Sequence, residues 1–98
     1  MKFAQIIEFR TSRIDDFNRN FDAWISRTGG TRIPHHAVLS RDREAGDRYL
    51  LIVEFASHDR GMENSKRPET SEFAAVLAEI SEAPLSFQNL DVIREEDL

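Results

Sequence analysis

The stretch that decides the fold is RYLLIVEF, residues 48–55, the most strand-like run in the chain. Its β-branched and aromatic residues favour a strand, and it is too short for a helix of ordinary length. A second stretch of the same kind, KFAQIIEFR, occupies residues 2–10. Both contain two β-branched residues followed by Glu-Phe, and a hydroxyl residue lies two positions after the Phe. This repeat predicts two βαβ halves, each with a strand that leads into a helix.

The segment after residues 2–10 has the periodicity of a helix. One helical face would carry Ile14, Phe17, Phe21, Trp24 and Ile25. This spacing predicts a helix over about 13–28. Ser12 and Asp15 have the spacing of a capping box at its start, and Gly29-Gly30 could end it with a positive φ.

Two more helical segments are expected after residues 48–55. Ser57 can cap a short helix over about 58–66, and Pro68 suits the first turn of another. The apolar face of that last helix would carry Phe73, Val76, Leu77 and Ile80. Pro84 prevents its continuation.

Residues 31–41 and 85–94 complete the pattern as strands, with a hairpin loop at 42–47. The order βαββαβ predicts a ferredoxin-like α+β fold, with a four-stranded antiparallel sheet and the helices on one face. We expect the strands at 2–10 and 48–55 to be parallel neighbours in the middle of the sheet. Residues 1–98 are expected to form one domain.

Composition narrows the classes of partner and site. Thirteen Lys and Arg against eighteen Asp and Glu give a net charge of −5, which argues against nucleic acid and anionic membranes as partners. The absence of Cys excludes disulfides, thiolate catalysis and Cys-based metal sites. The N-terminal residues lack the pattern of a signal peptide, and no apolar run approaches the ~18–20 residues of a membrane span. We therefore expect a cytoplasmic protein.

Both faces of the predicted sheet are apolar. Helices with one apolar stripe each can cover only one face, and no other segment remains for the second. The bulkier set, Phe3, Ile7, Phe9, Tyr49, Leu51, Val53 and Phe55, is expected beneath the helices. The other set, Ala4, Ile6, Leu50 and Ile52, is expected to be covered by a second copy of the chain, which predicts a homodimer.

Short stretches across the chain carry a family resemblance. They are IIEFR at 6–10, LIVEF at 51–55, MENS at 62–65, PET at 68–70 and FA at 73–74. Together they resemble dimeric α/β-barrel proteins of the antibiotic-biosynthesis-monooxygenase type. The resemblance implies a homodimer whose two sheets close a barrel, with a small-molecule cavity between helices and sheet in each subunit. Some members of that family are cofactor-free monooxygenases of polycyclic aromatic compounds, and others degrade haem.

The resemblance also bears on cofactors and site residues. Haem-degrading members need an Asn at the end of the first strand, a Trp in the second helical region and a downstream His. This chain has Phe9, Asn64 and Val76 at or near those positions, so no haem, other cofactor or metal is expected. Quinone-forming members use an Asn on the helix after the third strand, and Asn64 matches it.

Three residues are candidates for a site. His35 has the same strand parity as Ile33, Ala37 and Leu39 and could transfer a proton within a pocket. Trp24 could offer an aromatic wall to a flat substrate, and Asn64 could anchor its polar group. Each has a structural alternative: a solvent-facing His, a core Trp, and an Asn that ends a helix.

Other polar residues are interpreted as structural. Neighbouring strand residues point to opposite faces, so His35 and His36 cannot bind one metal together. His58 is expected at a helix start. Glu8 and Glu54 could form an acid/base pair if their strands are parallel, or they could form ion pairs with arginines instead. The candidate arginines are Arg10, Arg41 and Arg43.

Two functions remain open. The first is a cofactor-independent monooxygenase-like enzyme that binds a small, flat, apolar or phenolic molecule. The second is a non-catalytic ligand-binding or regulatory dimerisation module of the same fold. A cavity of several hundred Å³ that is lined by Asn64 and convergent polar groups favours the enzyme, and a cavity filled by Phe and Trp favours the module.

Overall fold

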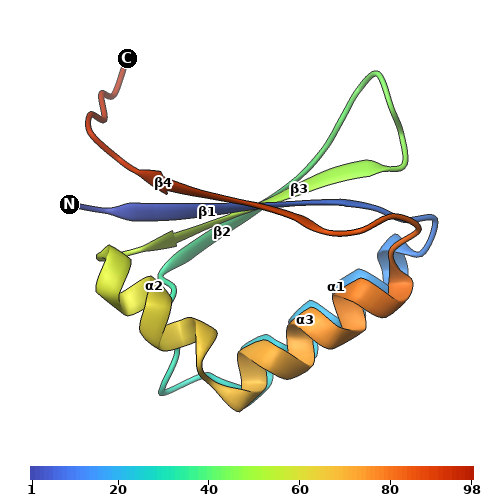
Figure 1. Ribbon diagram of the computed structural model, residues 1–98, viewed down its shortest axis with the longest axis horizontal. Coiled ribbons are helices and arrows are strands. Elements are labelled where there is room, and N and C mark those ends of the chain that lie inside the picture. Colours follow the sequence, from blue (N-terminus) through green and yellow to red (C-terminus); the bar gives the residue numbers. More distant parts are fainter.

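The protein folds as one four-stranded sheet with three helices on a single face (Figure 1). The computed structural model describes residues 1–98. The elements are β1 (Phe3–Arg10), α1 (Ile14–Arg27), β2 (His36–Arg41), β3 (Arg48–Phe55), α2 (His58–Ser65), α3 (Pro68–Ile80) and β4 (Ser86–Asp91). The strand order is β2-β3-β1-β4, and every neighbouring pair is antiparallel. This confirms the predicted ferredoxin-like α+β fold.

The predicted parallel pairing of β1 and β3 is wrong. Phe3 lies opposite Phe55 and Arg10 lies opposite Arg48, so the two strands run antiparallel. The hairpin at 42–47 reverses the chain, and β3 inserts between β1 and β2, the two strands that share one direction.

The direction of β3 also separates two glutamates. Glu8 lies opposite Leu50, whereas Glu54 lies opposite Ala4, near the other end of the strand pair. Of the two interpretations of these glutamates, the acid/base pair is therefore wrong.

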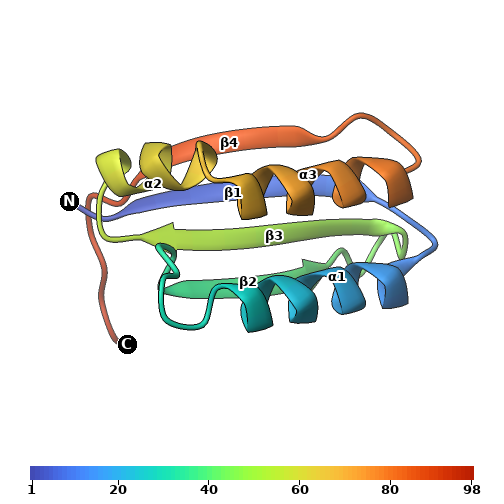
Figure 2. The same cartoon turned by 90° about the horizontal axis from the view of Figure 1, so that it is seen from below.

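The main core lies between the sheet and helices α1 and α3. Its buried members are Ile7, Phe9, Tyr49 and Leu51 from the sheet, and Phe17, Phe73, Leu77 and Ile80 from the helices. The ring of Phe9 stacks against Phe17 and Tyr49, with centroids 5.1 and 5.5 Å apart. The predicted assignment of the bulky strand residues to the helix side is confirmed. Seen from the helix side, α1 runs along β2, and α3 runs along β1 (Figure 2).

A smaller core cluster forms where α2 meets the sheet. It contains Phe3, Ile33 and Phe55, and Gly61 of α2 packs directly on it. A Cβ atom at Gly61 would lie 2.7 Å from two ring carbons of Phe3. The close approach of α2 to β1 therefore requires glycine at this position.

The two ends of α1 differ from their prediction. Ser12 makes no cap: its backbone N–H donates to a Glu82 carboxylate oxygen at 3.0 Å, and Thr11 Oγ1 accepts from the Arg13 N–H at 2.9 Å. At the other end the Thr28 hydroxyl donates to the Trp24 carbonyl at 2.7 Å, and no glycine has a positive φ. The capping box and the glycine-ended helix are both wrong, because hydroxyl and carboxylate groups satisfy these helix ends instead.

The starts of α2 and α3 agree with their prediction. Ser57 Oγ accepts from the Arg60 N–H at 3.2 Å, and Pro68 is the first residue of α3.

Two strands are shorter than expected, because β2 begins only at His36 and β4 covers Ser86–Asp91. None of the three helices combines the length and the apolar character needed to cross a membrane.

The sheet face opposite the helices is covered by no other helix or strand (Figure 1). We call its apolar part the open-face patch, which comprises Ala4, Ile6, Val38, Leu50, Ile52 and Leu90. Val38 and Leu90 are 42% and 43% exposed. Val38 on β2 and Leu90 on β4, at the two edges of the sheet, thus remain in contact with solvent.

Candidate functional site

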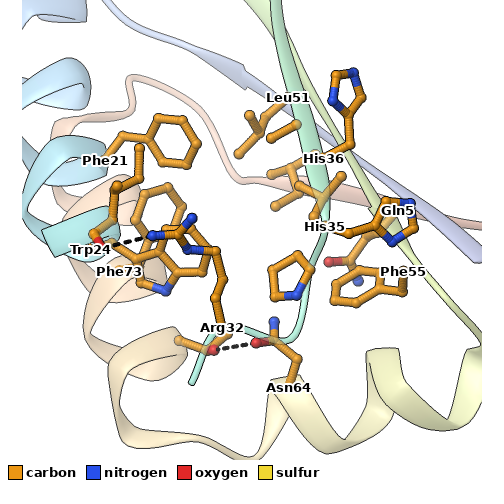
Figure 3. A pocket seen from close by; sticks show the side chains of 16 residues that line it. Gln5, Phe21, Trp24, Arg32, His35, His36, Leu51, Phe55, Asn64 and Phe73 are labelled. Carbon is orange, nitrogen blue, oxygen red and sulfur yellow. Dashed lines mark hydrogen bonds between the residues drawn. The ribbon is translucent and has the colours of Figure 1, made fainter. Parts of the chain in front are cut away.

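A pocket of about 320 Å³ lies between the sheet and helices α1, α2 and α3. Sheet residues such as Ile7, Leu51 and Val53 border it. Its aromatic side chains include Phe21, Trp24, Phe55 and Phe73, and its polar ones are Gln5, Arg32, His35, His36, Asn64 and Thr70 (Figure 3). The structure therefore brings all three predicted site residues together around one pocket.

The break between α2 and α3 helps to shape this pocket. Pro68 has no backbone N–H and cannot continue α2, so the chain turns between Ser65 and Pro68. The turn sets α2 at an angle to α3 (Figure 1). It also brings Asn64, at the end of α2, beside Thr70 in the first turn of α3.

Asn64 is half-buried, and its side chain has one hydrogen bond to the protein. Its Oδ1 atom accepts from the Thr70 hydroxyl at 3.3 Å. Its Nδ2 group donates to no protein atom, and the side chain points into the pocket (Figure 3). A side-chain amide carries two N–H donors, so Asn64 offers donors to a ligand. It also lies in the last turn of α2, as its structural alternative predicted.

Trp24 belongs to both the core and the pocket. Its ring stacks on Phe21 with centroids 5.7 Å apart and planes 8° apart, and it lies 6.3 Å from the ring of Phe73. The three rings form a continuous aromatic wall on the side of α1 and α3 (Figure 3). The packing that places Trp24 in the core also fixes its position in the wall.

His35 borders the pocket from outside β2. It is exposed, and its backbone N–H donates to the Glu54 carbonyl at 3.0 Å, whereas its imidazole makes no hydrogen bond within the chain. His36 begins β2, and the two rings lie apart (Figure 3). The structure contains no group of three or more His, Cys, Asp or Glu side chains that could hold a metal ion.

Arg32 is a pocket residue that the sequence interpretation missed. Its guanidinium carbon lies 5.5 Å from the centroid of the Trp24 ring. Its Nη2 donates to the Ile25 carbonyl at 2.8 Å, and its Nε donates to Thr28 Oγ1 at 3.2 Å. A basic residue soon after a helix is a familiar partner for the last carbonyls, which was the available signal. Its position over Trp24 depends on how the connection to β2 folds back.

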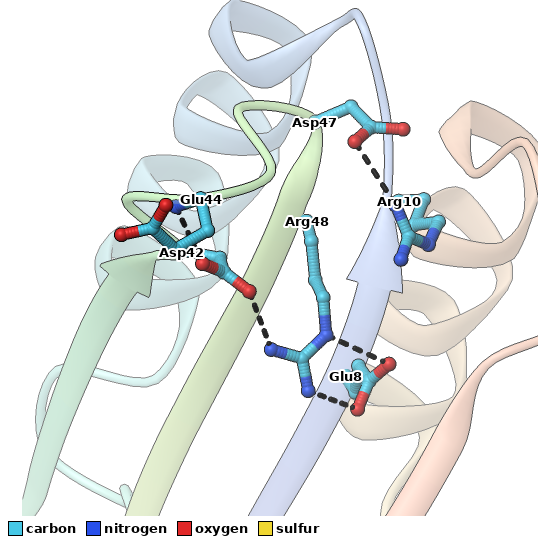
Figure 4. A network of polar contacts seen from close by, with 6 residues as sticks. All are labelled: Glu8, Arg10, Asp42, Glu44, Asp47 and Arg48. Atoms are coloured by element: carbon cyan, nitrogen blue, oxygen red, sulfur yellow. Dashed lines mark hydrogen bonds and ion pairs between the residues drawn. The ribbon is translucent and has the colours of Figure 1, made fainter.

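Two residues considered at first lie outside the pocket. Glu8 forms an ion pair with Arg48 on the open face of the sheet, so its interpretation as an ion-paired residue is confirmed, although its partner is not one of the predicted arginines (Figure 4). His58 begins α2, as expected, and its ring makes an edge contact with Phe3 at 5.1 Å. Both residues have structural roles.

The fold and the pocket define a class of protein: a ferredoxin-like α+β domain with a small-molecule-sized cavity between sheet and helices. No family profile matches the sequence, and no curated protein matches it.

Solved structures match the chain over nearly its whole length. Rv0793 from Mycobacterium tuberculosis has a TM-score of 0.76 and 20% identity, covering 99% of this chain and 100% of that one. SnoaB from Streptomyces nogalater, a cofactor-independent oxygenase, has a TM-score of 0.78 and 15% identity, covering 96% and 95%. An antibiotic biosynthesis monooxygenase has a TM-score of 0.73 and 10% identity, covering 96% and 100%. The chain therefore has the fold of the antibiotic biosynthesis monooxygenase-like proteins, as its resemblance predicted.

Proposed function

We propose that the protein binds a small, flat, apolar or phenolic molecule in its pocket and oxidises it with molecular oxygen without a cofactor. The observation that carries the proposal is the unpaired amide Nδ2 of Asn64, which points into an aromatic-walled pocket of about 320 Å³. Pockets of ~300–1,000 Å³ with apolar walls and a few polar groups are typical of small-molecule sites. A cofactor-independent oxygenase with the same fold supports the proposed chemistry.

The residues around the pocket have distinct proposed roles. Asn64 donates a hydrogen bond to a substrate oxygen, and Trp24 supports the flat ring. His35 accepts the proton whose removal leaves an electron-rich carbon, because a neutral imidazole has a nitrogen lone pair that can accept a proton. In an anthrone-type substrate that carbon is a CH₂ group between two rings. It loses two hydrogens and gains one atom of O₂ as a carbonyl, and the other oxygen atom leaves as water.

The alternative is a non-catalytic ligand-binding or regulatory module. One observation favours it: the His35 imidazole has no hydrogen-bond partner in the chain. A general base is usually oriented by a second group, so an imidazole without one is poorly prepared for catalysis. Under this alternative the same pocket holds its ligand unchanged.

Homodimerisation in the cytoplasm is part of the proposal. The open-face patch leaves Val38 and Leu90 exposed, and a two-fold related copy would cover both sheets at once. The cytoplasmic location is proposed from composition alone.

The decisive experiment uses 1,8-dihydroxyanthrone, a flat phenolic compound whose CH₂ group can be oxidised. Oxygen uptake and the absorbance of the quinone are followed together, and the spontaneous rate is subtracted. We expect the protein to accelerate both signals, and we expect Asn64→Ala to remove at least nine-tenths of the acceleration. Asn18→Ala, at an exposed position of α1, is the matched control and should keep full activity. Binding of the anthrone without any oxygen uptake would support the alternative instead.

A further inference from the structure

The charge of the pocket is opposite to that of the whole chain. The protein has a formal net charge of −5, yet no Asp or Glu lines the pocket. Its ionisable lining residues are Arg32, His35 and His36, all exposed at the pocket border. Because an arginine stays protonated, the lining is positively charged, and a bound anion would meet no carboxylate.

Arg32 is held in place without being neutralised. Its contacts with the Ile25 carbonyl and the Thr28 hydroxyl use Nη2 and Nε, and they leave Nη1 without a protein partner. Arg32 forms no ion pair, whereas Arg27 on the preceding helix is paired with Glu72. Its position near Trp24 orients the guanidinium at the aromatic wall. An oriented guanidinium with a free edge is a good partner for a carboxylate or another anionic oxygen.

We propose that the pocket selects a flat aromatic ligand that carries a negatively charged oxygen, and that Arg32 binds this oxygen. The ring lies against Trp24 and Phe73, and the Asn64 amide donates to a second polar atom of the ligand. This proposal rests on the pocket named in the proposed function, but it does not depend on turnover. It narrows the ligand from apolar or phenolic molecules to aromatic acids and ionised phenols.

A neutral ligand would leave the Arg32 guanidinium without an anionic hydrogen-bond partner. Closing a ligand over Arg32 removes water from the guanidinium, and only an anionic partner fully replaces the lost hydration. No carboxylate of the lining supplies that partner. The preference should therefore be strongest at low ionic strength, because salt screens the charge at an exposed rim.

The test compares 2-naphthoate with 2-naphthamide, which share the same ring and differ in charge. Trp24 is the only tryptophan, so quenching of its fluorescence reports binding in the pocket, and calorimetry gives the Kd. We expect the wild-type protein to bind naphthoate at least tenfold more tightly than naphthamide. The naphthoate Kd should rise with salt, and the naphthamide Kd should stay constant.

Variants then assign the preference to one residue. Arg32→Gln should weaken naphthoate binding at least tenfold and change naphthamide binding less than about twofold. Arg43→Gln removes the same charge from the exposed β2–β3 loop, at another arginine without an ion pair, and should behave as wild type. Circular dichroism checks the fold of each variant, and Arg32→Lys, which keeps the charge but not the planar fork, should fall between wild type and Arg32→Gln.

Several results would overturn the proposal. Equal affinity of the wild-type protein for both probes would overturn it without any variant. So would a result in which neither probe quenches the Trp24 fluorescence. A preference for naphthoate that persists in Arg32→Gln would also contradict it. Selective binding of naphthoate in a protein that never consumes oxygen would refute the proposed turnover and leave this inference standing. Oxygen uptake with 1,8-dihydroxyanthrone but equal binding of the two naphthalene probes would support the proposed turnover and refute this inference.

Discussion

Arg48 binds both carboxylate oxygens of Glu8 across the β1–β3 strand pair, with Nε and Nη2 donating at 3.1 and 2.9 Å (Figure 4). Its remaining group, Nη1, donates to Asp42 at 2.9 Å. Arg10 lies directly opposite Arg48 in the register and is paired with Asp47 at 3.0 Å. Each of these facing arginines therefore has its own carboxylate, which offsets the repulsion between like charges.

This network predicts acid sensitivity of the fold. The hydrogen bonds from Arg48 hold the pKa of Glu8 below its ordinary value of 4.5. A folded-state pKa below the unfolded value means that the stabilisation is present above about pH 4.5 and is lost as the pH falls through the folded pKa. Glu8→Gln should lower the Tm near pH 6, and its difference from wild type should shrink as the pH falls to about 3. Glu79→Gln, at an exposed position without an ion pair, is the control. A constant difference across this range would contradict the prediction.

The open-face patch predicts an interface between two copies of the chain. Ile52 lies in the middle of β3, between Val38 and Ile6 on the neighbouring strands. Burial of each large apolar side chain is worth ~1.5–3 kcal/mol, so Ile52→Arg should give a monomer or an insoluble protein. Ala75→Arg adds the same side chain on the exposed side of α3 and should leave the assembly unchanged. Light scattering at micromolar concentration measures the mass, and a monomeric wild-type protein would refute the interface.

The contact between Gly61 and Phe3 predicts that alanine at position 61 lowers the stability of the fold, although alanine usually stabilises a helix. Alanine normally stabilises a helix interior by up to ~1 kcal/mol relative to glycine. At Gly61 its Cβ would lie 2.7 Å from the Phe3 ring, so Gly61→Ala should lower the free energy of unfolding by about 1–3 kcal/mol. Gly30 has open space around it and no positive φ, so Gly30→Ala should be neutral or slightly stabilising. Urea denaturation of the two variants tests this contrast, and equal effects would show that α2 can move away from β1.

A ligand-binding role for Asn64 predicts that binding and stability respond differently to its removal. The side chain of Asn64 is half-buried and has only one hydrogen bond, at 3.3 Å from Thr70, so Asn64→Ala should change the free energy of unfolding by less than about 1 kcal/mol. Loss of its unpaired amide should nevertheless weaken naphthoate binding severalfold. Parallel loss of stability and binding would instead support a helix-ending role.

Local patterns were sufficient for most of the fold. The β-branched and aromatic residues of β3 predicted a strand, and the helical spacing of apolar residues predicted α1 and α3. Strand parity and side-chain bulk correctly placed Leu51 under the helices and left Ile52 on the other face. These patterns did not predict how α1 begins and ends. At the start of α1, the Thr11 hydroxyl donates to the Ile80 carbonyl and accepts from the Arg13 N–H. Such contacts follow no period in the sequence.

The sequence by itself determined a two-faced sheet and three helices, and it offered Trp24, His35 and Asn64 as candidate site residues. Only the tertiary structure decided that β3 runs against β1, that Glu8 meets Arg48 and that Arg32 approaches Trp24. Glu8 and Arg48 are 40 positions apart, and their contact depends on strand direction and register. Arg32 reaches Trp24 because the connection to β2 folds back along the last turn of α1. Periodicity records which side of an element is buried, but it carries no information about which distant residue packs there.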